Sequence, residues 1–221
     1  MRPLPDASPL RAAKAAAVET LAPLLNAIVP QEGRIATPGD YYEWYFAYGE
    51  VLRPKTVLEI GVLGGGSAAS LVLGAGGENC SIEHFDLIDN ESHDQQAVPL
   101  ALAASRVTRA AGGKFRANAY LLDSQRLRAL PDGPLYDLIS IDGDHRTGPC
   151  FHDLRISLPR LAPGGHILCD DAQWDWVKWA VDDFVAEHAW LDDLFVATHT
   201  GTRVLHSMGH IGECPLLEGC R

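Results

Sequence analysis

The chain has 221 residues, of which 47% are hydrophobic, and its 18 basic and 29 acidic side chains give a formal net charge of −11. This length and composition predict one sizeable α/β domain with a short N-terminal addition, and they exclude a disordered chain. The acidic charge repels nucleic acid phosphates and anionic membranes, so we expect neither as a general partner.

The first predicted element is a helix. Apolar residues recur at helical spacing over residues 10–28, after a serine and a proline that suit the N-cap and the first helical position. We interpret residues 1–35 as an N-terminal helical extension that forms a lid or packing arm, with a contact between two copies of the chain as the second reading. Residues 36–208 then form the main domain, and residues 209–221 form a tail.

An aromatic run from Tyr41 to Phe46 precedes the first predicted strand. Because aromatic side chains bury large areas wherever they lie, this run favours core packing over a substrate wall.

A short apolar segment, Thr56–Ile60, leads into a cluster of glycines and then into a run of small and apolar residues. The pattern predicts a buried parallel strand, a tight turn and the start of a helix. Glycines in such a turn let backbone N–H groups approach a ligand, and the helix N-terminus adds a partial positive charge. The spacing Glu-x-Gly-x-x-Gly-Gly-Gly, which begins at Glu59, differs from the Gly-x-Gly-x-x-Gly pattern of dinucleotide-binding folds.

The second predicted strand covers residues 80–87 and has acidic residues near its end. In nucleotide-binding α/β folds, an acid at this place accepts hydrogen bonds from ribose hydroxyls. Asp86 is our first choice for that role, and Asp89 is the reserve. A helix over residues 100–111 and a third strand over residues 114–117 follow.

Acidic residues come directly after two later strands. Asp142 follows the predicted strand 135–141, and the pair Asp170-Asp171 follows the strand 166–169. Parallel sheets bind ligands beyond the carboxyl ends of their strands, so these acids meet at one rim if the strands are neighbours, about 4.8 Å apart. Carboxylates so close together repel unless a positive group lies between them, and oxygen ligands favour Mg²⁺, with Mn²⁺ or Ca²⁺ as substitutes. The alternative is that one acid of the pair only caps the next helix.

The last predicted elements are a helix over residues 177–185 and strands over residues 193–199 and 202–208. Strands that alternate with helices and end in a hairpin indicate an α/β fold. We predict a mostly parallel seven-stranded sheet with a C-terminal antiparallel hairpin and helices on both faces. Three tryptophans follow the acidic pair: Trp174, Trp176 and Trp179. They either wall a planar or apolar substrate or, as we favour for Trp179 on the helix with Val177, pack between helix and sheet.

Four motifs occur together in one order and spacing: Glu59-x-Gly61, Asp142-Gly-Asp144-His145, Pro163-Gly-Gly and Asp170-Asp171. This set resembles the class I S-adenosylmethionine-dependent methyltransferases. It is most similar to the bacterial, metal-dependent small-molecule O-methyltransferases that tailor antibiotics and other natural products, which share the plan of catechol O-methyltransferase. The resemblance covers roughly residues 36–208. It implies a Rossmann-like sheet and S-adenosylmethionine as the cofactor.

The resemblance also implies roles for single residues. It places Mg²⁺ on Asp142, Asp170 and Asp171. Where catechol-type enzymes have a lysine base this chain has His145, whose ordinary pKa of about 6.5 suits a general base, and Asp144 is the alternative. The cofactor-binding residues that it implies are Glu59, Gly61, Gly65, Gly66, Ser67, Asp86, Asp123, Ser124 and Asp142. The pair Asp123-Ser124 serves equally well as a helix N-cap.

The function that we predict is S-adenosylmethionine-dependent O-methylation of a small molecule with adjacent oxygens, catechol-like or a vicinal diol, in secondary metabolism such as antibiotic biosynthesis. One alternative is a metal-independent N- or O-methyltransferase with a His/Asp base. Another is a non-methylating protein that uses the bound cofactor to assist cyclisation or hydroxylation. A nucleotide-binding oxidoreductase comes last because the glycine spacing differs.

The cysteines and the N-terminal residues bear on the compartment. The chain has five cysteines, an odd number, and charged residues interrupt its N-terminal alanines. No stretch approaches the roughly 20 apolar residues of a membrane span. We therefore expect a cytoplasmic enzyme with reduced thiols that acts on a small molecule, and a homodimer through the N-terminal helix.

Overall fold

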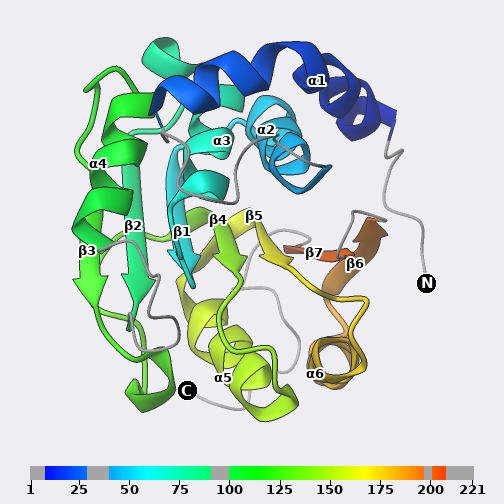
Figure 1. The fold of residues 1–221 in the computed structure, drawn as a ribbon. Helices are drawn as coiled ribbons and strands as arrows, with labels where there is room; N and C mark the ends of the chain where they lie inside the picture. Colours follow the sequence, from blue (N-terminus) through cyan, green and yellow to red (C-terminus); the bar gives the residue numbers. More distant parts are fainter. Residues whose placement is uncertain (1–7, 29–39, 91–99, 197–200, 208–221) are drawn as a thin grey trace.

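The computed structural model describes residues 8–28, 40–90, 100–196 and 201–207. Its centre is one seven-stranded sheet with the strand order β3-β2-β1-β4-β5-β7-β6 (Figure 1). The strands are β1 (Thr56–Ile60), β2 (His84–Asp89), β3 (Asn118–Leu121), β4 (Tyr136–Ile141), β5 (Leu161–Cys169), β6 (Leu191–Val196) and β7 (Thr202–Ser207). Strands β1 to β5 are parallel, whereas β7 pairs antiparallel with both β5 and β6. The mostly parallel sheet with its C-terminal antiparallel hairpin is therefore confirmed.

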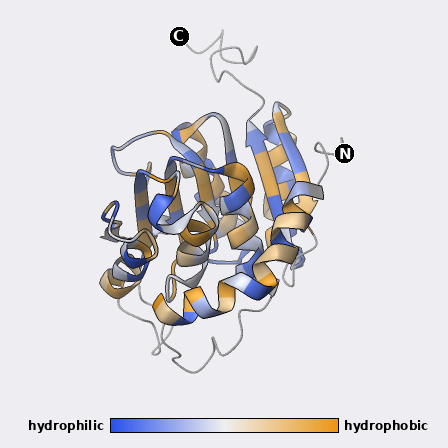
Figure 2. Cartoon of the chain, turned by 90° about the horizontal axis from the view of Figure 1, so that it is seen from above, coloured by the Kyte–Doolittle hydropathy of each residue, from blue (hydrophilic) through white to orange (hydrophobic). Residues whose placement is uncertain are grey.

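Helices cover both faces of this sheet. They are α1 (Ser8–Ile28), α2 (Asp40–Leu52), α3 (Gly66–Gly74), α4 (Leu100–Ala110), α5 (Thr147–Ser157) and α6 (Asp175–Glu187), with short 3-10 turns η1 (Gly77–Asn79), η2 (Ser124–Arg126) and η3 (Leu158–Arg160). Helices α1 to α4 lie on one side of the sheet, and α5 and α6 lie on the other (Figure 1). Hydrophobic and hydrophilic residues alternate along the helices, as expected for elements that bury one face (Figure 2).

Side chains of successive strand residues enter two separate cores because they point to opposite faces of the sheet. In β1, Val57 packs in the core with α1 to α4, and Leu58 packs in the core with α5 and α6. The same alternation places Glu59 on the side of α1 to α4. Which face a strand residue occupies is therefore fixed by the parity of its position, and this decides which strand-end acids reach the site.

Two predicted strands are shifted in the structure. The second begins at His84 and not at position 80, because Glu83 N and His84 N donate to Lys55 O and start the pairing there. The third begins at Asn118 and not at position 114, because Lys114 still belongs to the turn that ends α4, where its N–H donates to Ala111 O.

The N-terminal helix α1 is part of the first core. Its apolar stripe is buried against α2 and α3: Ala13, Ala17, Leu21, Leu25 and Ile28. The face on which we based a homodimer is therefore covered within the chain itself, and the dimer stays a prediction. Among the described residues, no helix combines the length and apolar character that a membrane crossing requires.

Candidate active site

The carboxyl ends of β1, β4 and β5 lie side by side. Asp142 N donates to Ile60 O over 2.8 Å, and Asp170 N donates to Ile141 O over 3.1 Å. Three chain segments that are far apart in sequence therefore leave the sheet at one rim. The strand order reverses between β1 and β4, which is where open α/β sheets bind ligands.

The glycine turn lies directly against the Asp142 segment. Gly61 has a φ of +84°, and a Cβ at this position would lie 2.1 Å from Asp142 O. Gly65, with a φ of +72°, is the N-cap of α3, and a Cβ on Gly66 would lie 2.6 Å from the Tyr42 ring. Glycine fits these positions because the backbone at Gly61 and the ring at Gly66 leave no space for a Cβ, and because Gly61 and Gly65 have positive φ.

Glu59 is buried beneath this turn with half of its carboxylate unpaired. Its side chain is 1% exposed, and Ser67 Oγ donates to Oε1 over 2.5 Å. Its second oxygen, Oε2, has no hydrogen-bond partner among the described residues. Burial raises the pKa of Glu59 to about 8. A buried carboxylate oxygen without a partner is costly, so it fits a cationic ligand group that enters from the turn.

The structure does not bring Asp86 to this turn. Asp86 lies in the middle of β2 on the opposite face from Glu59, where Tyr136 Oη and Asn118 Nδ2 donate to its carboxylate over 2.6 and 2.8 Å. Asp89, our reserve, lies at the carboxyl end of the strand and accepts hydrogen bonds from the first two backbone N–H groups after Gly61. Asp89 faces the turn and Asp86 does not, because side chains alternate between the two faces of a strand and these residues are three positions apart.

Asp123 and Ser124 lie beyond the carboxyl end of β3. Asp123 is the N-cap of η2 and accepts from Gln125 N over 3.1 Å, as the capping alternative predicts. Gln125 Nε2 in turn donates to Asp153 Oδ1 of α5 over 2.8 Å. The contact with adenine that the resemblance implies for this pair stays a prediction.

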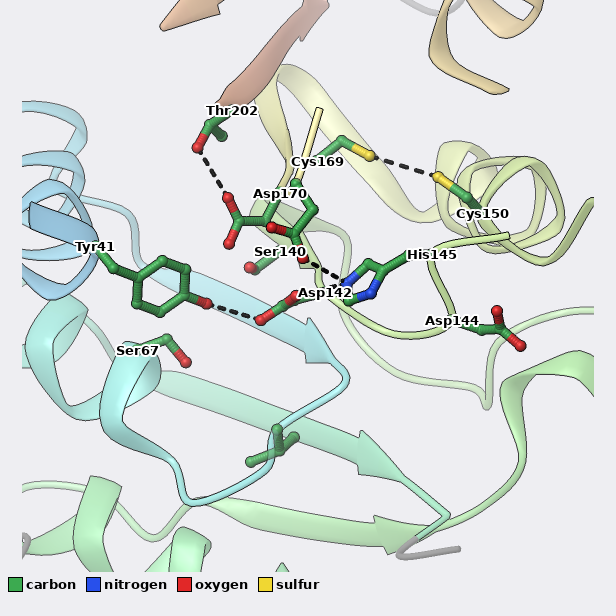
Figure 3. A network of polar contacts seen from close by, with 12 residues as sticks. Tyr41, Ser67, Ser140, Asp142, Asp144, His145, Cys150, Cys169, Asp170 and Thr202 are labelled. Atoms are coloured by element: carbon green, nitrogen blue, oxygen red, sulfur yellow. Dashed lines mark hydrogen bonds and ion pairs between the residues drawn. The ribbon is translucent and has the colours of Figure 1, made fainter. Parts of the chain in front are cut away.

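Two acids and a histidine converge at the rim. His145 Nε2 lies 3.2 Å from Asp142 Oδ1 and 2.9 Å from Asp171 Oδ2 (Figure 3). One ligand atom of each residue lies within 4.8 Å of the other two, which is close enough for all three to bind one metal ion. Of the acidic pair that we expected to meet Asp142, Asp171 is thus part of this cluster.

Asp170 is near this group but has another partner. Its carboxylate is buried, and Thr202 Oγ1 at the start of β7 donates to Oδ1 over 3.1 Å (Figure 3). Asp171 has a φ of +54°, and its carboxylate contacts His145. The compact triad therefore contains His145 in the place that we predicted for Asp170.

Both predicted bases are paired with other side chains. Hydrogen bonds to Asp142 and Asp171 raise the pKa of His145 to about 10. Asp144 turns away from Asp142 and is held by Arg146, whose Nε lies 3.0 Å from both carboxylate oxygens (Figure 3).

Sequence reasoning missed a tyrosine in the site. Tyr41 Oη donates to Asp142 Oδ2 over 2.7 Å (Figure 3). Tyr45 Oη lies 2.9 Å from Ser140 Oγ. The signal was present in the aromatic run, because two tyrosines four positions apart share one face of a helix. Core packing explains the buried Tyr45, but Tyr41 also orients an acid of the site.

The three tryptophans near the rim are not buried. Trp174, Trp176 and Trp179 are 48%, 58% and 48% exposed. The rings of Trp174 and His145 form a T-shaped contact, with ring centroids 5.1 Å apart and planes at 77°. Packing between helix and sheet, our alternative reading, is therefore wrong for these side chains.

Known proteins share this fold. The family described as "Methyltransferase domain" matches residues 58–172, and a search of curated protein sequences gave no match. Cofactor-bound Rv0187 from MTB is similar with 18% sequence identity and a TM-score of 0.59, over 95% of this chain and 100% of that chain. The O-methyltransferase from Bacillus cereus in complex with SAH has 17% identity and a TM-score of 0.57, over 92% of each chain.

A third structure, the SAH-bound Podospora anserina methyltransferase, has 18% identity and a TM-score of 0.55, over 93% of this chain and 98% of that chain. At such identities the solved structures show the fold alone, whereas the family match spans more than half of the sequence. The glycine turn, the rim acids and this match together lead to one conclusion: the chain belongs to the methyltransferase domain family, with the class I fold, and is a methyltransferase.

Proposed function

We propose that the protein is an S-adenosylmethionine-dependent O-methyltransferase that acts on a small molecule with two adjacent oxygens, with a divalent cation at the rim. The observation that carries this proposal is the unpaired Oε2 of Glu59, buried below the glycine turn and one strand away from the Asp142 cluster. A carboxylate for a cationic cofactor and a carboxylate cluster for a cation are thus neighbours.

The cofactor would lie across the carboxyl ends of β1 and β2. Glu59 Oε2 would accept from the amino group of its methionine part, and the N-terminus of α3 would attract its carboxylate. Asp89 is the acid nearest to the turn for the ribose hydroxyls. Asp123 and Ser124 lie further along the same rim and are proposed to border the adenine. The Bacillus cereus and Podospora anserina structures, each in complex with SAH, support this choice of cofactor.

The residues at the rim fit a divalent cation. Asp142 and Asp171 direct carboxylate oxygens to one point, and oxygen donors suit Mg²⁺, Mn²⁺ or Ca²⁺. Such an ion supplies Lewis acidity that lowers the pKa of a bound hydroxyl. Tyr41 holds one oxygen of Asp142 and leaves the other directed into the cluster.

The acceptor would enter beside Trp174, whose exposed ring lies against His145. Since His145 contacts Asp142 and Asp171 and Asp144 is paired with Arg146, we assign the base to neither in this arrangement. A role in secondary metabolism follows from the resemblance and is part of the proposal.

Two measurements test the proposal. The purified chain is incubated with S-adenosylmethionine and a panel of catechols and vicinal diols, with Mg²⁺ or with EDTA, and SAH formation is measured by mass spectrometry. We expect acceptor-dependent SAH that EDTA abolishes. Transfer that persists in EDTA would favour the metal-independent alternative, and tight cofactor binding without SAH would favour the non-methylating one.

Calorimetric titration with SAH tests the cofactor site. Glu59→Gln should weaken binding at least tenfold, because it removes the negative charge opposite the amino group. The matched control is Glu83→Gln, an exposed glutamate outside the site. Equal affinities of the two variants for SAH would refute the role of Glu59.

A further inference from the structure

We propose that His145 is itself a ligand of the rim cation. The site then has nitrogen and oxygen ligands and suits a divalent transition-metal ion, for which Mn²⁺ is the probe. The inference deepens the proposed function and rests on its cation site. It replaces the three-carboxylate set expected from the sequence with Asp142, His145 and Asp171.

The spacing of the donor atoms supports this assignment. Two ligands that bind one divalent ion at about 2.1 Å each, at right angles, lie about 3.0 Å apart. His145 Nε2 lies 3.2 Å from Asp142 Oδ1 and 2.9 Å from Asp171 Oδ2. The imidazole nitrogen therefore sits where a ligand adjacent to both carboxylates belongs.

Neighbouring contacts orient the same three donor atoms, two carboxylate oxygens and one imidazole nitrogen, toward one another. Tyr41 Oη occupies Asp142 Oδ2, which leaves Oδ1 facing His145. Trp174 forms a T-shaped contact with the imidazole, and Thr202 Oγ1 donates to Oδ1 of Asp170. Two oxygens and one nitrogen thus converge on one place. The acceptor can add further ligands to a cation bound there.

A nitrogen ligand changes which ion the site prefers. Mg²⁺ binds oxygen almost exclusively and keeps several waters, whereas imidazole suits first-row transition metals. We therefore expect Mn²⁺ to bind more tightly than Mg²⁺, and the preference to depend on His145. A lone pair of Nε2 that binds the cation is not available to accept a proton, so His145 is then not the general base.

The test measures Mn²⁺ binding to the full chain without cofactor or acceptor. Electron spin echo envelope modulation of bound Mn²⁺ should show ¹⁴N coupling of a directly bound imidazole in the wild type and none in His145→Gln. Titration should show at least tenfold weaker Mn²⁺ binding in that variant and less than threefold weaker Mg²⁺ binding. The control is His188→Gln at the end of α6, which should match the wild type.

A second variant guards against misfolding of the first. His145→Glu restores an all-oxygen set and should shift the preference from Mn²⁺ toward Mg²⁺, with folding checked by circular dichroism. Bound Mn²⁺ without ¹⁴N coupling in the wild type, or an unchanged ratio of Mn²⁺ to Mg²⁺ affinity in both variants, would overturn the assignment.

The outcome is separable from that of the proposed function. Nitrogen coupling in a protein that forms no SAH supports the metal assignment and refutes O-methylation. SAH formation with Mg²⁺ but without nitrogen coupling supports O-methylation and refutes the metal assignment. Failure of Mn²⁺ to bind at all refutes the assignment.

Discussion

At the scale of single residues, the carboxylate of Asp142 is shared between partners from distant parts of the chain. Tyr41 of α2 donates to one oxygen, and His145 contacts the other. The helix that carries Tyr41 thereby fixes the orientation of a side chain at the end of β4.

Tyr41→Phe removes that hydrogen bond and retains the ring. We expect about tenfold weaker binding of a divalent cation, since a hydrogen bond to a charged group contributes about 1.5 kcal/mol or more. Titration with Mn²⁺ measures the effect, and Tyr120→Phe on β3 serves as the control. Unchanged cation affinity in Tyr41→Phe would show that Tyr41 only packs.

Glu59 makes a second prediction at this scale. Burial raises its pKa to about 8 in the folded chain, above the ordinary value of about 4.5, so the ionised form destabilises the cofactor-free protein. The resulting loss of folding stability is absent at pH 4 and grows as the pH rises from about 4.5 to 8.

Glu59→Gln should therefore raise the free energy of unfolding by about 2–4 kcal/mol at pH 8 and have little effect at pH 4. Urea denaturation of the cofactor-free chain at both pH values checks this, with Glu83→Gln as the control. A Glu59→Gln effect of equal size at both pH values would contradict a cause in ionisation.

At the scale of elements, α2 and α3 approach each other through glycines. A Cβ on Gly49 would lie 2.1 Å from Leu71 O, and a Cβ on Gly74 would lie 1.9 Å from Phe46 O. This approach matters for the site because α2 carries Tyr41 and α3 begins at the glycine turn.

Gly74→Ala forces the two helices apart and should lower the free energy of unfolding by about 2–3 kcal/mol. Gly148→Ala in α5 is the matched control, because a Cβ there meets nothing within 4 Å and alanine favours a helix. Chemical denaturation of both variants measures the difference. Equal stability of the two would mean that the α2–α3 contact adapts without cost.

At the scale of the whole molecule, Arg203 joins the C-terminal hairpin to a helix. Arg203 on β7 is 5% exposed, and its guanidinium binds Asp193 of β6 and Asp182 of α6. Strand β7 begins at Thr202, whose hydroxyl donates a hydrogen bond to Asp170 at the rim. The hairpin therefore contacts the site directly.

Arg203→Met should lower the free energy of unfolding by about 2–4 kcal/mol, because it leaves the carboxylate of Asp193 partly buried without its cation. Thermal denaturation at neutral pH measures the loss. Lys178→Met, which removes an exposed ion pair with the same Asp182, should change stability by less than about 1 kcal/mol. A loss of stability in Arg203→Met as small as that in Lys178→Met would show that the hairpin does not depend on this network.

The sequence alone determined the order of the elements, the glycine turn and the acids at the strand ends, because these depend on local periodicity and spacing. It did not determine which side chains meet. Asp86 and Asp89 differ in the face of β2 that they occupy and in their place along the strand, and the start of pairing at His84 sets that place. His145 joins Asp142 and Asp171 because β4 lies next to β5, a pairing between segments that no local pattern encodes. Only the tertiary structure decided the composition of the site, since contacts at a rim depend on strand order and on the direction of each side chain after its strand ends.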